Sequence, residues 1–495
     1  MREIQIQEGE VWYPAVSEYG PEMPYDQKTQ TEVQMTRNPT ANQMQPLLLS
    51  SHGRILYHWE GYTAKFDSGM IRVDEDAIML VEGCKTLKEA YRYACVRWFE
   101  RGQLQVRSEL MEQPIYNTWM HAPFQVTEEK VLAYGAEIEA QQLPVGTLII
   151  DDKWSLAYGD WRFDHEKFPN PEAMIAFFHE KGFFVMLWVC PYVSFGTEAF
   201  ETCKEQDLLL KEGEGISALT WWNETSACLD LRKEEALDYM RASLQSLMEL
   251  GVDGFKFDGG DSRFYTKEQE PDLQSHQWAL LASEYAFNEL RAEYHGAGLS
   301  LFERLSDKRN SWGSDGIGGI LPSALALGLS GHPFFAPDMI GGGEVKDLLD
   351  GKHVEKELFF AHCQLAMLFP GIQFSLLPGA VLGSDLSVLQ AQWETRKQYL
   401  PYLREEIAKS RVTKEPLIRL MEYEFPGEGM EYVTDQFMLG ERYLVIPMTK
   451  KKQKHLEVCL PGGRWKYQDR ILKGGRIVKI PAAWDRIAVL ERMNR

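Results

Sequence analysis

Short apolar runs that alternate with longer amphipathic stretches are the feature that most limits how this sequence can fold. From about residue 115, seven runs rich in β-branched and aromatic residues read as strands: IYNTWM, GTLIID, FFVMLWV, GFKFD, LSLFERL, PFFAPD and GIQFSLL. The stretches between them, such as PEAMIAFFHEKG and EALDYMRASLQSLMELG, carry the 3.6-residue apolar period of helices. This alternation predicts parallel βαβ units of the α/β class. Seven strands in roughly 290 residues favour a (β/α)₈ TIM barrel over an open doubly wound sheet.

The two ends of the chain have a different pattern from the middle. In residues 1–110, segments such as GRILYHWEG and AKFDSGMIRVD are short, alternating and interrupted by Gly and Asp, which predicts an N-terminal β-sandwich-like domain. A helix is expected over Thr86–Arg101. The barrel is expected over residues 111–402. Strand patterns such as RYLVIPMT and KHLEVCLP then predict a C-terminal β-sandwich domain over residues 403–495.

Composition excludes several classes of function. The formal net charge of −20 argues against nucleic acid and anionic membrane surfaces as partners. Seven cysteines without a CxxC pair disfavour a zinc site or a disulfide framework, and eleven histidines without HxH or HExxH disfavour a catalytic metal. Because we find neither an apolar leader nor an 18-residue apolar run, we expect a cytoplasmic chain without a membrane anchor. No metal or organic cofactor is expected, and assembly into a homo-oligomer is left open.

Carboxylates follow the predicted strands at the places where barrel enzymes carry their chemistry. GTLIID ends on Asp151 and is followed by Asp152, Asp258 ends GFKFD, and Asp338 ends PFFAPD. Asp315 lies in the Gly-rich segment WGSDGIGG. A single strand-end Asp often caps the next helix. Several such positions, flanked by Trp, Lys and Gly, favour a sugar site instead, because aromatic faces and carboxylates suit a pyranose ring and its hydroxyls.

Asp258 is the candidate nucleophile on the strength of its neighbours. The period of two places Lys256 on the same side of the strand, so its ammonium is expected to favour the ionised carboxylate or to donate to a substrate hydroxyl. The alternative is a buried structural ion pair. Asp315, beside Trp312, is the candidate for the second, protonated carboxyl, because partial desolvation there would raise its pKa. The alternative is an ordinary turn Asp next to Gly.

At these residues the sequence resembles glycoside hydrolase family 31, from about Tyr116 to the C-terminus. The motifs that carry the resemblance occur in the family's order: YNTW, IDDKWSLAYGDWRFDHEKFPNP, LWVCPYV, WWNETSACLDL, GFKFDGGD, RLSDKRNSWGSDGIGG, GHPFFAPDMIGGG and GIQFSLLPG. The resemblance implies that Asp258 is the nucleophile, Asp315 the general acid/base and Asp338 a supporting carboxylate. The side chains expected around the sugar are Trp119, Asp151, Asp152, Trp188, Trp222, Lys256, Arg304, Trp312 and Asp338.

The implied activity is that of a retaining exo-α-glycosidase working by double displacement on a small carbohydrate substrate. Two departures from the family pattern bear on specificity. GIQFSLLPG has no His, and Ser375 stands near the place where many family α-glucosidases carry one, which favours an α-galactosidase-like branch. Asp261 replaces the usual Glu three residues after the nucleophile. The alternatives are an α-glucosidase, α-xylosidase or α-N-acetylhexosaminidase of the same family, a transglycosylase, or a non-catalytic carbohydrate-binding protein.

Overall fold

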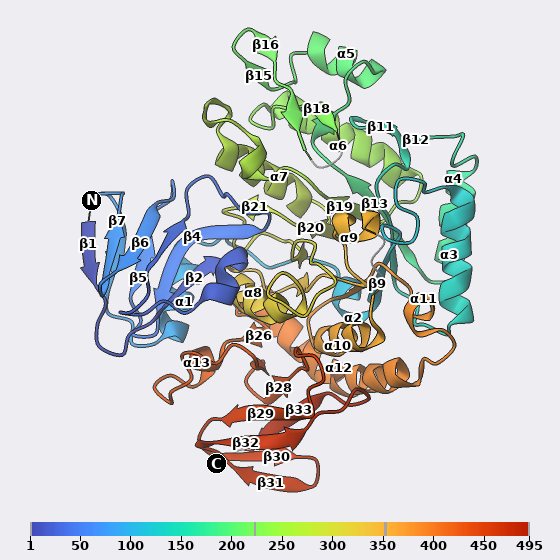
Figure 1. The fold of residues 1–495 in the computed structure, drawn as a ribbon. Helices are drawn as coiled ribbons and strands as arrows, with labels where there is room; N and C mark the ends of the chain where they lie inside the picture. The colour runs from blue at the N-terminus through green and yellow to red at the C-terminus, as the bar shows by residue number, and fades with distance from the viewer. Residues whose placement is uncertain (1, 222–223, 351–353, 494–495) are drawn as a thin grey trace.

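The central part of the computed structural model is a closed parallel barrel, as the strand–helix alternation predicts (Figure 1). The structure describes residues 2–221, 224–350 and 354–493. The order of the parallel sheet is β23-β22-β20-β19-β13-β10-β9-β25-β24. The bounds of these strands are Pro114–Asn117 (β9), Thr147–Ile150 (β10), Phe184–Val189 (β13), Gly254–Phe257 (β19), Asn288–Leu290 (β20), Glu303–Arg304 (β22), Phe335–Ala336 (β23), Met339–Ile340 (β24) and Ile372–Phe374 (β25). Because β23 and β24 are consecutive halves of one stretch, the sheet closes into a barrel of eight strands.

The sequence analysis missed one strand of this barrel. Strand β20 has the sequence NEL, so it offers no apolar run by which it could be recognised. Its polar side chains form hydrogen bonds and ion pairs with other buried groups, which are described below. GIQFSLL, the seventh strand expected from the sequence, is therefore the eighth strand, β25.

The strands and helices of the barrel follow from their apolar patterns. Strand β13, FVMLWV, is buried over five of its six residues, as expected for a central parallel strand. Its parallel pairing with β19 sets Trp188 opposite Lys256. Helices α3 (Glu128–Ala140), α4 (Pro171–Glu180) and α6 (Glu234–Glu249) cover the outside of this part of the barrel (Figure 1).

The N-terminal domain consists of two antiparallel sheets, as expected. One has the order β1-β7-β6-β3 and the other β2-β4-β5-β8. Their bounds are Arg2–Gln5 (β1), Trp12–Val16 (β2), Thr31–Gln34 (β3), Gln43–Ser50 (β4), Ile55–Tyr57 (β5), Thr63–Asp67 (β6), Met70–Val73 (β7) and Met79–Val81 (β8). Apolar side chains of both sheets form one buried cluster. Helix α1 (Leu87–Arg97) follows, and the Thr86 hydroxyl accepts a bond from Glu89 N at its start.

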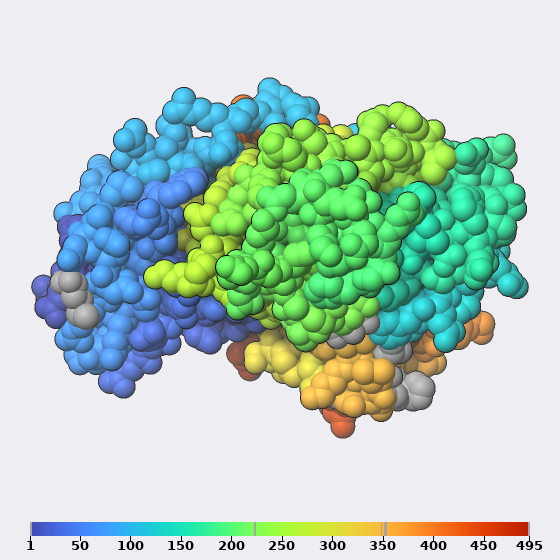
Figure 2. All heavy atoms as spheres, turned by 90° about the horizontal axis from the view of Figure 1, so that it is seen from above, coloured from blue at the N-terminus to red at the C-terminus, as the bar shows by residue number. Residues whose placement is uncertain are grey.

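The N-terminal domain is joined tightly to the barrel. Figure 2 shows its residues, in blue, lying against the yellow-green middle of the chain. The 3₁₀ turn at Ser17–Glu22 packs on helix α8 (Ile317–Leu329), where a Cβ on Gly20 would lie 2.3 Å from Pro322 O. Strand β21 (Glu293–Tyr294), in the segment after β20, pairs in parallel with β4 of the N-terminal sheet. The N-terminal domain therefore reaches the side of the barrel where β20 ends.

The C-terminal domain is a pair of antiparallel sheets below the barrel (Figure 1). Helix α12 (Ser387–Thr413) runs across the expected boundary at residues 402 and 403 before the sheets begin. The larger sheet contains β26 (Ile418–Arg419), β27 (Phe437–Leu439), β28 (Tyr443–Ile446), β30 (Arg464–Tyr467), β31 (Arg470–Lys473) and β33 (Ala488–Met493). The smaller sheet pairs β29 (His455–Leu460) with β32 (Arg476–Pro481). All seven cysteines are free thiols. Among the described residues, we find no helix with the length and apolar character needed to cross a bilayer.

Candidate active site

A cavity of about 260 Å³ lies at the carboxyl ends of the barrel strands. This volume is below the roughly 300–1,000 Å³ of sites for drug-sized ligands, so it suits an occupant as small as one sugar ring. Five of the predicted site residues line it: Trp119, Asp151, Trp188, Lys256 and Asp258. The other lining residues are Ala41, Arg263, Arg291, Ser306, Asp307, Met339, Glu344 and Val345.

Asp258 presents an ionised carboxylate to this cavity. Its Oδ1 accepts bonds from Arg291 Nε at 2.9 Å and from its neighbour Gly259 N at 2.8 Å. Its Oδ2 accepts a bond from Trp188 Nε1 at 3.0 Å. Burial alone would raise the pKa of Asp258, but Arg291, followed by Lys256 and Arg304, outweighs burial and holds that pKa well below its usual range. A carboxylate of this kind can act as a nucleophile at neutral pH.

Lys256 differs from the expectation in its partner. Its Nζ forms an ion pair at 2.7 Å with Oδ2 of Asp151, which follows β10 on the far side of β13, and it acts on Asp258 only through space. Burial opposes the ammonium, yet Asp151 outweighs burial and the pKa of Lys256 is raised. The sequence placed Lys256 and Asp258 on one side of the strand, but it could not show that Asp151 on another strand lies nearer.

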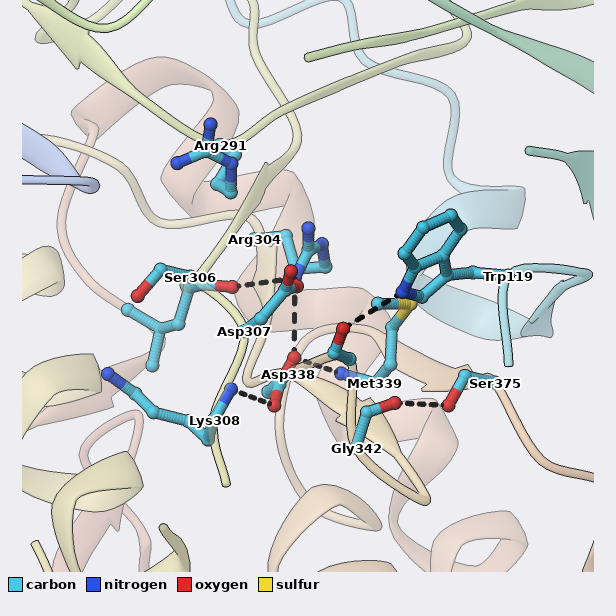
Figure 3. Close-up of polar contacts among 12 residues, drawn as sticks. Trp119, Arg291, Arg304, Ser306, Asp307, Lys308, Asp338, Met339, Gly342 and Ser375 are labelled. Carbon is cyan, nitrogen blue, oxygen red and sulfur yellow. Dashed lines mark hydrogen bonds and ion pairs between the residues drawn. The ribbon is translucent and has the colours of Figure 1, made fainter. Parts of the chain in front are cut away.

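Arg304, expected to donate to the sugar or to a carboxylate, is buried beneath the cavity and is paired with carboxylates. Figure 3 shows its guanidinium beside Asp307 and Asp338. Arg304 Nη1 lies 2.7 Å from Asp307 Oδ1 and 3.2 Å from Asp338 Oδ1, and Nε lies 3.2 Å from Glu289 Oε1 on β20. Glu289 also accepts a 2.6 Å bond from Gln373 Nε2 of β25. The polar residues of the unrecognised strand therefore satisfy a buried charge network.

Two further predicted carboxylates are buried behind the cavity lining. Asp338 accepts bonds from the backbone N–H groups of Lys308 and Met339, and burial followed by repulsion from Asp307 raises its pKa to about 7 (Figure 3). Asp152 accepts a 2.7 Å bond from the Tyr158 hydroxyl, and burial raises its pKa to about 7. Both carboxyls can therefore carry a proton near neutral pH.

The structure does not bring Asp315 or Trp312 into the cavity lining. Asp315 is exposed, and its Oδ1 accepts a 2.5 Å bond from the Ser311 hydroxyl. The expected desolvation beside Trp312 is therefore absent from the described geometry. Trp312 is half-buried and packs against the main core. Trp222 lies outside the described residues.

The sequence analysis missed four charged residues of the cavity lining, Arg263, Arg291, Asp307 and Glu344, of which Asp307 and Arg291 lie in or beside the network described above. Asp307 was in view within RLSDKRN, but nothing in that motif separates it from a surface loop residue. Arg291 directly follows the unrecognised strand β20, so its position at a strand end went unnoticed. Helix periodicity and strand spacing carried no signal for either residue.

Ser375, the residue near the place of a family histidine, does not line the cavity. It is buried, and its hydroxyl donates to the carbonyl oxygen of Gly342 (Figure 3). Met339 lines the cavity in this region, and no histidine occurs among its described lining residues. Within the described part of the chain, no cluster of three His, Cys, Asp or Glu residues is arranged to hold a metal ion.

Comparison with known proteins places the chain in a family. Residues 110–310 match the model of the glycosyl hydrolases family 31 TIM-barrel domain, and residues 414–495 match the model of the family 31 C-terminal domain. The myogenesis-regulating glycosidase of Mus musculus is 30% identical over 409 residues, which cover 79% of this chain and 57% of the relative. The chain belongs to glycoside hydrolase family 31.

Other members of glycoside hydrolase family 31 differ in the sugars named in their descriptions. An α-xylosidase of Emericella nidulans is 27% identical over 67% of this chain and 45% of its own length. This chain therefore spans about half the length of these curated relatives. A family 31 sulfoquinovosidase from E. rectale shares the fold with a TM-score of 0.85 at 15% identity, covering 100% of this chain and 82% of that one.

Proposed function

We propose that this protein is a retaining exo-α-glycosidase that removes a terminal sugar, with Asp258 as nucleophile. The observation that carries the proposal is the carboxyl group of Asp258 at the wall of a small cavity, where it accepts bonds from Trp188 and Arg291. A cavity of sugar-ring size favours action on a chain end over action within a polymer. Membership of the family supports the reaction type.

The reaction follows from two carboxyl groups acting in turn. A carboxylate oxygen of Asp258 forms a bond to the anomeric carbon while the bond to the leaving oxygen breaks and a second carboxyl protonates that oxygen. The same second group then takes a proton from water, whose oxygen attacks the anomeric carbon and releases Asp258. Two inversions leave the α configuration unchanged, and the two carboxyls should lie roughly 5–5.5 Å apart during this cycle.

The second carboxyl has two candidates. The family pattern assigns it to Asp315, which lies on an exposed loop in the structure. Asp307 lines the cavity with Asp258, but its Oδ1 already accepts a bond from Arg304 Nη1 at 2.7 Å, which holds that carboxylate against Arg304. We therefore assign the acid/base role to Asp315 and expect its loop to close over a bound substrate.

The proposed sugar is an α-linked galactose. It is supported by the likeness to the branch that contains the myogenesis-regulating glycosidase, and by the position of Ser375, whose hydroxyl is engaged by backbone instead of facing the cavity. An α-xyloside is the second candidate, because α-xylosidases are among the relatives. α-Glucosides and α-N-acetylhexosaminides complete the set to be tested.

A panel of nitrophenyl α-glycosides tests the activity and the sugar together. We expect the α-galactoside to be the best substrate, and Asp258→Ala to lower its turnover to background. Asp67→Ala, which changes a half-buried aspartate of the N-terminal sheet that pairs with Arg72, far from the cavity lining, serves as the control for protein quality. Turnover by Asp258→Ala at the wild-type rate would reject the nucleophile. No turnover of any glycoside by the wild type would favour a carbohydrate-binding protein instead.

A further inference from the structure

Arg291 makes more contacts with the nucleophile and its loop than any reaction step above requires. Its Nε donates to Asp258 Oδ1 at 2.9 Å. Its Nη1 and Nη2 donate to Asp261 Oδ1 and Oδ2 at 3.1 and 2.8 Å. Its Nη1 also donates to Ala41 O at 2.7 Å. These contacts fix the plane of the guanidinium group. Arg291 therefore cannot turn all five of its N–H donors toward a substrate.

The loop after the nucleophile is shaped so that both carboxylates face this arginine. Gly259 and Gly260 have φ of +68° and +73°, a conformation that residues with a side chain rarely adopt. A Cβ at Gly259 would lie 2.7 Å from the Tyr192 ring, and one at Gly260 would lie 2.6 Å from the Trp278 ring. The turn therefore brings Asp261, the residue that departs from the family pattern, back beside Asp258.

The N-terminal domain holds Arg291 from both ends. Ala41 O receives the guanidinium, and Gln43 Nε2 donates to the Arg291 carbonyl oxygen at 2.7 Å. The arginine side chain is 13% exposed, and Asp261 is fully buried. A cation so enclosed cannot move away from Asp258 without breaking bonds to two domains.

Resting on the function proposed above, we infer that Arg291 is a positioning residue for the nucleophile, braced by Asp261 and Ala41. It fixes Oδ1 of Asp258, which accepts two bonds, and leaves Oδ2, which accepts one bond from Trp188, as the oxygen that attacks the sugar. The same cation stabilises the carboxylate each time Asp258 is released from the glycosyl-enzyme, when the bond from the anomeric carbon to Oδ2 breaks and its electron pair returns to Asp258.

Two kinetic consequences separate this role from a merely structural one. Arg291 stabilises the free carboxylate relative to the ester, so its removal slows release of the sugar more than attack on it. With nitrophenyl glycosides we therefore expect Arg291→Met to lower kcat and KM together, with a smaller change in kcat/KM. Its removal also raises the pKa of Asp258, so the acid limb of kcat/KM should move to higher pH.

Arg263→Met is the matched control for the charge. Arg263 lines the same cavity and lies 3.2 Å from Asp261, yet it has no described bond to Asp258. Its removal takes away one cavity cation and should leave the acid limb in place. Asp261→Asn tests the same contact in the other direction, because it removes a negative charge that competes with Asp258 for Arg291. We therefore expect the acid limb of Asp261→Asn to stay in place or move to lower pH. We expect its kcat to fall, because Arg291 loses its brace.

The experiment is the pH profile of kcat and kcat/KM for these variants of the full chain, on the best glycoside of the panel. An acid limb of Arg291→Met at the wild-type position would overturn the inference. If Arg291→Met does not fold, Asp261→Asn decides the question, because a rise of its acid limb would equally overturn it. If the wild type turns over no glycoside, the proposed function is rejected. If the wild type is active and the acid limb of Arg291→Met stays at the wild-type pH, only the role of Arg291 is rejected.

Discussion

At the residue scale, the position of Asp258 at the cavity could be predicted, but its charge partners could not. Asp258 stands at the end of an apolar strand with the right spacing to Lys256, and local pattern detects both. The ion pairs depend on the order of the strands in the barrel. In that order Lys256 pairs with Asp151, and Arg291 pairs with Asp258. Local periodicity contains no information on such pairings between distant segments.

Asp315 shows that a sequence motif does not predict whether a residue lines the cavity. A motif identifies the residue by its neighbours in sequence, whereas the cavity is defined by residues from five or more segments of the chain. Asp315 is exposed, whereas Asp307 lies in the cavity lining. The assignment of the acid/base role to Asp315 is therefore tested against Asp307.

Chemical rescue distinguishes the two carboxyls. We expect Asp315→Ala to lose about 10²–10⁴-fold in kcat/KM for glycosides with poor leaving groups, and far less in kcat/KM for a dinitrophenyl glycoside, whose leaving group needs no protonation. Azide should accelerate Asp315→Ala and yield an α-glycosyl azide, because the small anion attacks the glycosyl-enzyme without a general base. Azide should not accelerate Asp307→Ala. Rescue of Asp307→Ala in place of Asp315→Ala would move the acid/base role to Asp307.

At the element scale, the missed strand explains what the sequence analysis could not see. Strand β20 is polar because Asn288 and Glu289 satisfy buried partners: the Asn288 side chain bonds the backbone of Ser300 and Phe302, and Glu289 bonds Arg304 and Gln373. Strands with an apolar run were recognised, whereas β20, whose polar residues bind the buried charge network, was not. The helices, by contrast, followed their periodicity, as in α4 and α6.

The junction between β4 and β21 has a specific requirement for Gln43. Its buried side-chain amide donates to Glu303 Oε2 at 2.8 Å and to the carbonyl oxygens of Arg291 and Arg304 at 2.7 and 3.0 Å. Gln43→Met keeps the volume and leaves these acceptors unpaired, at a cost of about 1–3 kcal/mol for each group. We expect a lower midpoint of thermal unfolding and lower kcat.

The matched control for this change is Gln34→Met, which alters an exposed glutamine on strand β3 of the neighbouring sheet. Circular dichroism melts and nitrophenyl glycoside assays on both variants give the comparison. Equal melting temperatures for Gln43→Met and Gln34→Met would show that the junction does not depend on this amide.

At the scale of the whole molecule, the active site belongs to two domains. The barrel supplies the strands and their carboxylates, while the N-terminal domain supplies Ala41, from the loop before β4, to the cavity wall and Gln43, on β4, to the loop beneath it. The order of domains could be predicted from the sequence pattern. The strands of the terminal domains are short and alternate apolar with polar residues, whereas the barrel strands are apolar runs separated by helices. Their contact could not, because it rests on close backbone approach, as at Gly20 against Pro322, and on side-chain amides.

The measurement that tests the central claim most directly is mass spectrometry of the whole chain after reaction with a fluorinated α-galactosyl fluoride, which slows release of the sugar. We predict one added glycosyl group per chain, located by peptide mapping on Asp258, and no adduct on Asp258→Ala. An adduct on another carboxylate, such as Asp151 or Asp307, would contradict the account. So would sustained turnover of nitrophenyl glycosides by a protein that never forms an adduct.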